Sequence, residues 1–227
     1  MEERNLSNLK IEYNPSTPPN FQYFPMEVAL DTETDGVNLL KAELITAAIY
    51  YPTIHTTHIH PRASITGDLF EYLKLLLQKA QVVGHNLPFD ARVLMRLNQS
   101  LRIKNPFDTY LLASQYQCKP LSLKSLCIQF GVAGALPKDL SSYQSLLSQV
   151  FNKTGAEIEA ALATEEGQKE FNLEKIDIAN TPIALKYVGA DPYLAYALKE
   201  KFKELSSAQQ NAESILSKFE ASVDHPI

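Results

Sequence analysis

The sequence predicts an α/β domain in which a mixed sheet is flanked by helices, and two observations favour this class. Three short strand-like segments follow one another near the N-terminus. After them, amphipathic helices alternate with short apolar strands. The first pattern is typical of three antiparallel strands, and the second adds parallel strands to the same sheet. A chain of 227 residues can bury one substantial core, so we expect one main domain.

The three opening strands are expected after a lead-in. Residues 1–25 contain a cluster of Asn, Ser, Thr and Pro, which favours an extended N-terminal lead-in over a packed element. The apolar run Met26–Leu30 then predicts a strand that leads into Asp31. Residues 42–51 and 56–60 predict the second and third strands of the meander.

Alternating helices and strands are expected next. Thr66 can cap a helix with apolar residues at helical spacing, and residues 81–84 form a short apolar strand. A helix begins at Pro88, which suits a first-turn position, and runs to Leu97. Asp108 can cap the following helix, and residues 122–131 predict one more, ended by glycine.

The C-terminal half is expected to be helical. Residues 138–180 predict a helical insertion, and Thr181-Pro182 begins a long helix that extends to Leu205. The main domain would therefore span 26–205. Residues 206–227 are expected to form a further C-terminal helix.

Composition limits the possible functions. The net charge of −5 argues against a protein that coats duplex DNA with Lys and Arg, so any nucleic-acid contact must be local. No apolar run approaches the roughly 18 residues of a membrane span, and the N-terminus lacks the pattern of a signal peptide. With only Cys118 and Cys127, we expect a reducing, cytoplasmic compartment in a bacterial or phage-like context.

Two motifs place carboxylates near strand ends. In DTET, Asp31 and Glu33 are two residues apart, so strand alternation puts both on one face, where they can share a cation. For this pair alone, ordinary turn residues are the more common explanation. In GHNLPFD, Asp90 lies one turn into a helix, in the kind of crevice where α/β sheets bind ligands. A carboxylate that faces the helix dipole is the structural alternative.

The third motif is YVGAD in the last long helix. Tyr187 and Asp191 are four residues apart, which places a phenol beside a carboxylate on one helical face. A surface helix with a partly buried tyrosine explains either residue singly, but not all three motifs in this order. Pro192 disfavours helical backbone at Asp191, and a kink there would alter the spacing of the pair.

Together, DTET, GHNLPFD and the Tyr-x-x-x-Asp of YVGAD resemble the DEDD superfamily of 3'→5' exonucleases, in its tyrosine-bearing branch. FDTYLLASQ and LSLKSLCIQFGV extend the similarity to the proofreading exonuclease domain of family A, DNA polymerase I-like, DNA polymerases. The resemblance covers roughly residues 26–205 and implies a ribonuclease H-like fold. It also implies that the tail would continue into a polymerase domain, through a split gene or an excised domain.

The resemblance implies a two-metal-ion site with Mg²⁺ or Mn²⁺, which suit oxygen ligands. Asp31, Glu33 and Asp191 would hold one ion, and Asp31 and Asp90 the other. Tyr187 would orient the attacking water, because a phenol is a poor base at neutral pH. Contacts to the terminal nucleotide are implied for three further residues, which are Thr32, Asn86 and Leu87.

The function implied is hydrolysis of DNA from the 3' end to 5'-mononucleotides, in proofreading for a polymerase. Its partners would be a single-stranded DNA 3' end and a polymerase domain or subunit, and the chain by itself is expected to be monomeric without membrane contact. One alternative is an RNA 3'-trimming exonuclease of the ribonuclease D type, which shares the motifs. The other is an inactive scaffold or strand-binding module, against which the four intact carboxylates argue.

The histidines invite a different metal hypothesis. His55, His58 and His60 lie in HTTHIH, and alternation would place the last two on one face of a strand. We favour an ordinary third strand over a zinc site, because no cysteine lies near. We expect a structural hydrogen-bonding role for His85, and helix capping for Asp108.

Overall fold

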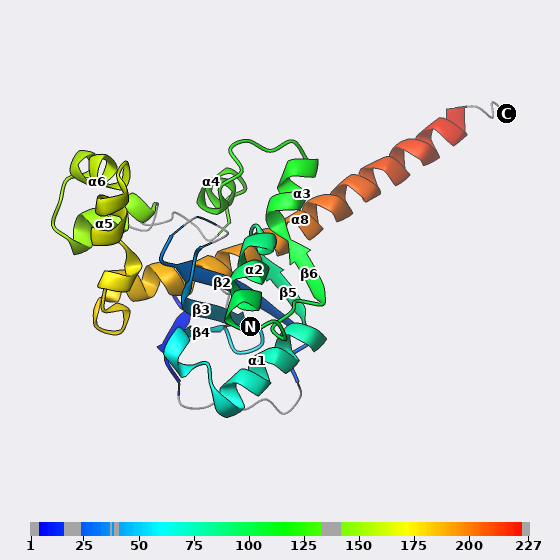
Figure 1. Ribbon diagram of the computed structural model, residues 1–227. Coiled ribbons are helices and arrows are strands. Elements are labelled where there is room, and N and C mark those ends of the chain that lie inside the picture. The colour runs from blue at the N-terminus through cyan, green and yellow to red at the C-terminus, as the bar shows by residue number, and fades with distance from the viewer. Residues whose placement is uncertain (1–4, 16–23, 37, 39–40, 133–141, 224–227) are drawn as a thin grey trace.

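The computed structural model describes residues 5–15, 24–36, 38, 41–132 and 142–223, with side chains up to 206 except those of 165 and 169. Six strands form one mixed sheet in the order β1-β4-β3-β2-β5-β6 (Figure 1). Strands β2, β3 and β4 pair antiparallel, whereas β1–β4, β2–β5 and β5–β6 pair parallel. The strand bounds are β1 Lys10–Tyr13, β2 Glu27–Thr34, β3 Leu44–Tyr51, β4 Thr56–Pro61, β5 Gln81–Gly84 and β6 Asn105–Asp108.

Helices follow β4, β5 and β6, and helices cover both faces of the sheet (Figure 1). The α-helices are α1 Gly67–Lys79, α2 Leu87–Leu97, α3 Thr109–Gln115, α4 Leu123–Gln129, α5 Tyr143–Val150, α6 Gly155–Leu162, α7 Glu165–Glu170 and α8 Pro182–Val223. Within the described residues, single-turn 3₁₀ helices lie at Arg62–Ser64, Leu173–Lys175 and Ile178–Asn180. Among the described residues, no helix is both long enough and apolar enough to cross a membrane.

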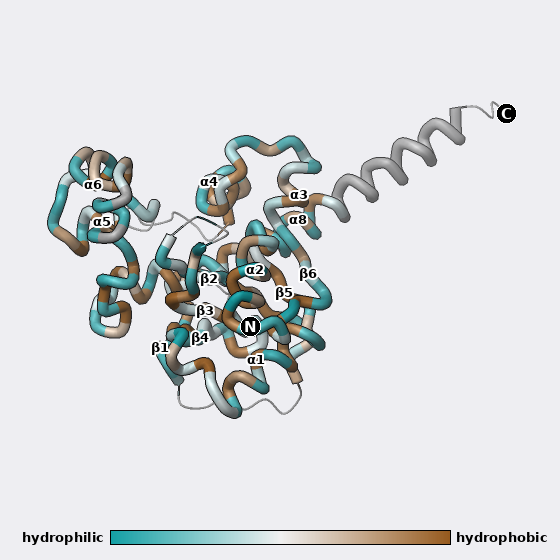
Figure 2. The backbone as a smooth tube through the Cα atoms, viewed as in Figure 1, coloured by the Kyte–Doolittle hydropathy of each residue, from teal (hydrophilic) through white to brown (hydrophobic). Residues whose placement is uncertain are grey.

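Strand alternation divides the core into two layers. Val28 and Leu30 of β2 pack with α1 and α2, whereas Ala29 between them packs with α8 on the opposite face. Both faces are therefore apolar, as in a sheet covered on each side by helices. Figure 2 shows the apolar positions gathered where α1, α2 and α8 meet the central strands.

The predicted meander, the strand at 81–84 and the helices that begin near Thr66, Pro88 and Asp108 are confirmed. Two parts of the sheet differ from expectation. The N-terminal lead-in contains β1, which forms a sheet edge against β4, so the expectation of an unpacked segment is wrong there. Its four residues, KIEY, alternate polar and apolar, but so short a segment is a weak signal for a strand. Residues 16–20 of the predicted cluster lie outside the described part.

The other difference is strand β6, which was not predicted. It contains Pro106, and its first residues are exposed. Proline is tolerated here since β6 pairs only with β5 and forms the opposite edge. Strand β2 includes the DTET motif, as the alternation of Asp31 and Glu33 requires. It runs to Thr34, so Asp31 and Glu33 are strand residues paired with β3.

The C-terminal half is helical, as predicted. The segment from Tyr143 to Asn180 contains α5, α6, α7 and two 3₁₀ turns, while residues 138–141 of the predicted insertion lie outside the described part. The last helix is a single α8 that continues through Pro192. Its C-terminal half extends away from the sheet (Figure 1), and residues 224–227 of the predicted tail are not described.

Candidate active site

Asp31 and Glu33 project from β2 on the face that α8 covers. They share this face with Ala29, because alternate residues of a strand point the same way. Thr32, between them, is buried and points to the α2 side. The central strand thus directs two carboxylates to one helix layer and a hydroxyl to the other.

Asp90 is held against this strand from the first turn of α2. Only 4% of its surface is exposed. The backbone N–H and the hydroxyl of Thr32 both donate to Asp90 Oδ1, at 2.9 and 2.7 Å. These two hydrogen bonds fix the carboxylate of α2 beside the Asp31–Glu33 segment.

Tyr187 and Asp191 lie one turn apart on α8, and both contact the same residue, Lys124 of α4. The ammonium nitrogen of Lys124 is 3.2 Å from Asp191 Oδ1 and 3.5 Å from the centre of the Tyr187 ring. A shared neighbour shows that phenol and carboxylate face the same way, as their spacing predicts. The sequence analysis missed Lys124, because a lysine in a short amphipathic helix carries no signal that distinguishes it from a solvated one.

The pKa of all four site carboxyl groups is raised. Burial is the largest cause for each of them. The pKa of Asp31 is raised further by Glu33, Asp90 and Asp191, while Lys124 lowers it. The Thr32 hydrogen bonds partly offset the rise at Asp90. At neutral pH this group of carboxylates carries more negative charge than its neighbours balance. Protons or a bound cation would supply the missing positive charge.

The donor set fits a hard divalent cation, because it consists of carboxylate oxygens with uncompensated negative charge. It is not preformed, however. Within the described residues, no group of three or more His, Cys, Asp or Glu side chains is arranged to hold a metal ion. Two of the oxygens are engaged by protein groups, Asp90 Oδ1 by Thr32 and Asp191 Oδ1 by Lys124.

The phenol of Tyr187 keeps its proton at neutral pH. Its ring is 8% exposed. Burial, and then the negative charges of Asp191, Glu33 and Asp31, raise its pKa well above the usual value of a phenol. A neutral hydroxyl at this position can donate or accept a hydrogen bond, but it cannot act as a base.

A cavity of about 420 Å³ opens beside Glu33 and Tyr187. One wall is the end of β2 with residues 34–36. The other comes from the helical segment after α4, including the aromatic rings of Tyr143 and Phe171. The cavity therefore connects the carboxylate site with the predicted insertion.

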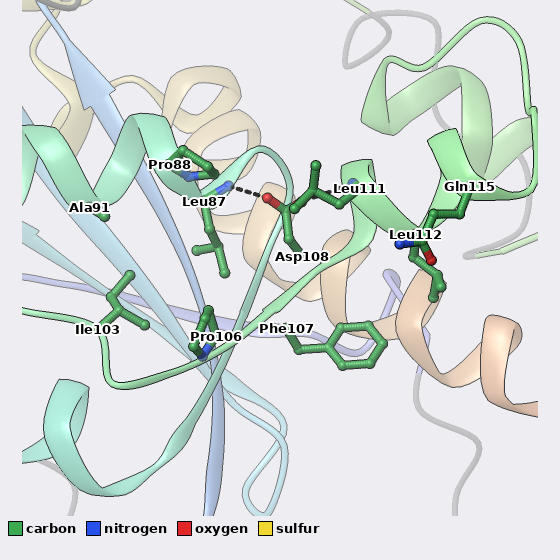
Figure 3. A pocket seen from close by; sticks show the side chains of 10 residues that line it. All are labelled: Leu87, Pro88, Ala91, Ile103, Pro106, Phe107, Asp108, Leu111, Leu112 and Gln115. Atoms are coloured by element: carbon green, nitrogen blue, oxygen red, sulfur yellow. Dashed lines mark hydrogen bonds between the residues drawn. The ribbon is translucent and has the colours of Figure 1, made fainter.

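The backbone of Asn86 and Leu87 is hydrogen-bonded to the side chain of Asp108. Asn86 has the left-handed φ of 68°, and the N–H groups of Asn86 and Leu87 donate to the two Asp108 carboxylate oxygens at 3.0 Å each. Figure 3 shows the bond to Leu87. Asp108 also caps α3 by accepting from Tyr110 N at 2.9 Å, which confirms its predicted capping role.

The Leu87 side chain is 3% exposed and points into the α1–α2 core layer. It lies so close to Gly84 that a Cβ there would be 2.4 Å from Leu87 Cδ2, so glycine is required at the end of β5. Leu87 also lines an apolar cavity of about 460 Å³ between α2, β6 and α3 (Figure 3). Its predicted contact with a nucleobase remains a prediction.

The histidines occupy structural positions. His85 is hydrogen-bonded to Thr109 Oγ1 at 3.0 Å and to the Leu121 carbonyl at 2.8 Å, as the prediction of a structural role requires. His58 and His60 lie on β4, the predicted third strand, and both are buried. The Nε2 atom of His58 is 3.2 Å from Glu12 of β1.

Comparison with known proteins identifies relatives. Residues 13–205 match the model of a family described as 3'-5' exonuclease. Comparison with curated proteins finds no match. Among solved structures, Brucella melitensis NrnC superposes with a TM-score of 0.58 at 16% identity, over 93% of this chain and 89% of that one.

The same Brucella melitensis nuclease is similar in two further states. NrnC bound to pGG gives a TM-score of 0.55 at 16% identity, over 89% of this chain and 86% of that one. NrnC with bound Mg²⁺ gives 0.54 at 17% identity, over 93% and 88%. At these identities the likeness concerns the fold, and the predicted ribonuclease H-like α/β fold is confirmed.

Proposed function

This chain belongs to the 3'-5' exonuclease family whose model spans residues 13–205, and on that premise we propose that it hydrolyses single-stranded 3' ends with divalent cations. The observation that carries the proposal is the convergence of carboxylates from three separate elements. Strand β2 supplies two of them, α2 the third and α8 the fourth. The four are Asp31, Glu33, Asp90 and Asp191.

Asp31, Glu33 and Asp191 would hold one cation, and Asp31 and Asp90 a second. When bound, two such ions stabilise the attacking and the leaving oxygen of the phosphodiester. Mg²⁺ is the first candidate, since NrnC with bound Mg²⁺ has a similar fold, and Mn²⁺ is the second. The buried carboxylates favour cation binding, because a buried negative charge without a positive partner is energetically costly.

The chain's own side chains would position the reactants. Tyr187 would hold the attacking water by a hydrogen bond from its neutral hydroxyl, in line with its raised pKa. Thr32 fixes Asp90 through two hydrogen bonds, so its role would be to orient a ligand carboxylate. This differs from the nucleotide contact that the resemblance implies for Thr32, which remains a prediction together with that of Asn86.

The 420 Å³ cavity beside Glu33 and Tyr187 would receive the terminal nucleotide. The rings of Tyr143 and Phe171 offer apolar faces against which any base can stack. The segment 138–180 would then act as the wall of the substrate site. The NrnC structure bound to pGG is consistent with a site of this fold that takes a very short strand end.

DNA is the substrate that the sequence motifs predict first, and RNA is the alternative. Proofreading beside a polymerase, with residues 206–227 as the connection, remains a prediction, because the similar structures named above are nucleases and not polymerases. A cytoplasmic location and a monomeric state remain predictions in the same sense.

A matched degradation assay tests these proposals. Single-stranded DNA and RNA of identical sequence, labelled at the 5' end, are incubated with Mg²⁺ or with EDTA. We expect stepwise shortening from the 3' end that requires the cation. Asp31→Asn should reduce the rate by on the order of 10³-fold, because the cations contribute several kcal/mol. The exposed Asp68 on α1 provides the control Asp68→Asn, which should retain activity.

Each outcome has a distinct meaning. Preferential degradation of RNA would replace the DNA proposal by the RNA-trimming alternative. Binding of strands without degradation by the unmodified protein would favour the inactive strand-binding module. Undiminished Mg²⁺-dependent activity of Asp31→Asn would reject the assignment of the carboxylates.

A further inference from the structure

Lys124 reaches the candidate active site from α4, outside the three motifs. Its side chain is 12% exposed and that of Asp191 is 14% exposed, so their contact at 3.2 Å is largely shielded from water. The ammonium also lies 3.5 Å from the centre of the Tyr187 ring. Lys124 thus contacts both α8 side chains of the site.

The charge of Lys124 acts on several carboxyl groups at once. It lowers the pKa of Asp31, Glu33 and Asp191, against the burial and mutual repulsion that raise it. One ammonium therefore faces a group of buried carboxylates that would otherwise repel one another. Removing it from the metal-free protein would leave those charges without a counter-ion, which is costly in a shielded site.

The ammonium and a divalent cation would share one carboxylate. Asp191 Oδ1 lies 3.2 Å from the Lys124 ammonium, and Asp191 is a carboxylate that the proposed function assigns to a cation. Two cations held at one carboxylate in a shielded site repel each other. The ring of Tyr187 offers the ammonium a second attractive surface on the same side, so Lys124 can leave Asp191 without leaving the site.

We propose that Lys124 is a built-in counter-ion that competes with the divalent cation for Asp191, so that metal binding exchanges one cation for another. Lys124 is in this sense a positioning residue: it holds Asp191 and Tyr187 in place while no cation is bound. The inference rests on the proposed function, because it requires a divalent cation at Asp191.

Calorimetric titration of the full chain with Mn²⁺, in the absence of nucleic acid, tests the exchange. Lys124→Met removes the charge and keeps the length of the side chain. Lys124→Arg keeps the charge. Lys186→Met is the matched control, because Lys186 is exposed on α8 beside Tyr187 in the sequence and its loss changes the net charge equally.

Without the competitor, Lys124→Met should bind Mn²⁺ more tightly by on the order of tenfold, since close charge pairs couple at least this strongly. Lys124→Arg and Lys186→Met should stay within about threefold of the unmodified protein. Unchanged or weaker binding by Lys124→Met would overturn the inference, and so would an equal gain in Lys186→Met. Absence of Mn²⁺ binding by the unmodified protein would instead overturn the proposed function.

A variant that unfolds without metal is still informative. The melting temperature is then measured over a Mn²⁺ series. If Lys124→Met lacks a folded state in EDTA, Mn²⁺ should restore it, because a cation that binds only the folded state stabilises that state increasingly as its concentration rises above the dissociation constant. Failure of Mn²⁺ to restore the fold would show that Lys124 acts through packing alone and would reject the exchange.

Discussion

Acidification should destabilise this protein through a histidine in the sheet. His60 of β4 is fully buried, and neither of its ring nitrogens has a hydrogen-bond partner among the described residues. Burial, and to a lesser extent the neighbouring His58, lowers its pKa from 6.5 to about 4. The folded protein thus keeps this ring neutral at a pH where the unfolded chain already protonates it.

The sign follows from proton binding. Below pH 6.5 His60 becomes protonated in the unfolded chain but stays neutral in the folded protein. The free energy of unfolding therefore decreases as the pH falls towards 4. Each pH unit in this window costs about 1.4 kcal/mol, and the full shift about 3 kcal/mol. Above pH 6.5 the contribution is complete and constant. The site carboxylates, whose pKa is raised, change stability in the opposite direction.

Urea unfolding at pH 7.5, 6.0 and 5.0 measures this effect, and comparison with His60→Phe isolates it. The carboxylates contribute alike to both proteins, so they cancel in the difference. We expect the free energy of unfolding of the unmodified protein to fall more steeply with acid, by an excess approaching 1.4 kcal/mol per pH unit. Parallel pH profiles for the two proteins would refute the reasoning.

Three further substitutions test contacts of the site. Thr32→Val leaves Asp90 Oδ1 with only a backbone donor and should lower the free energy of unfolding by about 1–3 kcal/mol in urea titration. Gly189→Ala places a Cβ 2.7 Å from Ile11 and should cost about 1–3 kcal/mol by calorimetry; on an Ile11→Ala background the cost should shrink. Tyr187→Phe should keep the melting temperature within a few degrees but lower kcat by about 10²-fold, since it loses only the hydroxyl that is proposed to hold the attacking water.

The sequence predicts the elements whose signal is local. Strands β2 to β5 and helices α1 and α2 carry apolar periodicity and turn residues of their own, so their positions could be expected within a few residues. The carboxylates were predictable for a related reason. Strand alternation and helical spacing fix which face Asp31, Glu33, Tyr187 and Asp191 occupy, although the convergence of the three motifs needed the family resemblance.

The features that escaped prediction depend on contacts between distant segments. Strand β1 exists through its pairing with β4, and its Ile11 packs against Gly189 of α8. From the sequence, Gly189 is only a poor helix former. In the structure, its lack of a side chain leaves room for β1 to pack against α8. Lys124 is a similar case. Its partners Tyr187 and Asp191 are about 63 and 67 residues away in the sequence, and no local pattern predicts these contacts.

The position of Asp191 depends both on its local sequence and on contacts with a distant segment. Pro192 removes the donor for the Val188 carbonyl, and from the sequence this threatened the geometry of the Tyr187–Asp191 pair. Helix α8 nevertheless continues through it. Helix α4 packs beside this turn, with Lys124 on Asp191 and the Cys127 thiol 3.8 Å from the Leu194 carbonyl. Because these contacts flank Pro192 on both sides, the position of the fourth carboxylate is set by α4 as much as by α8, and α4 belongs to the candidate site.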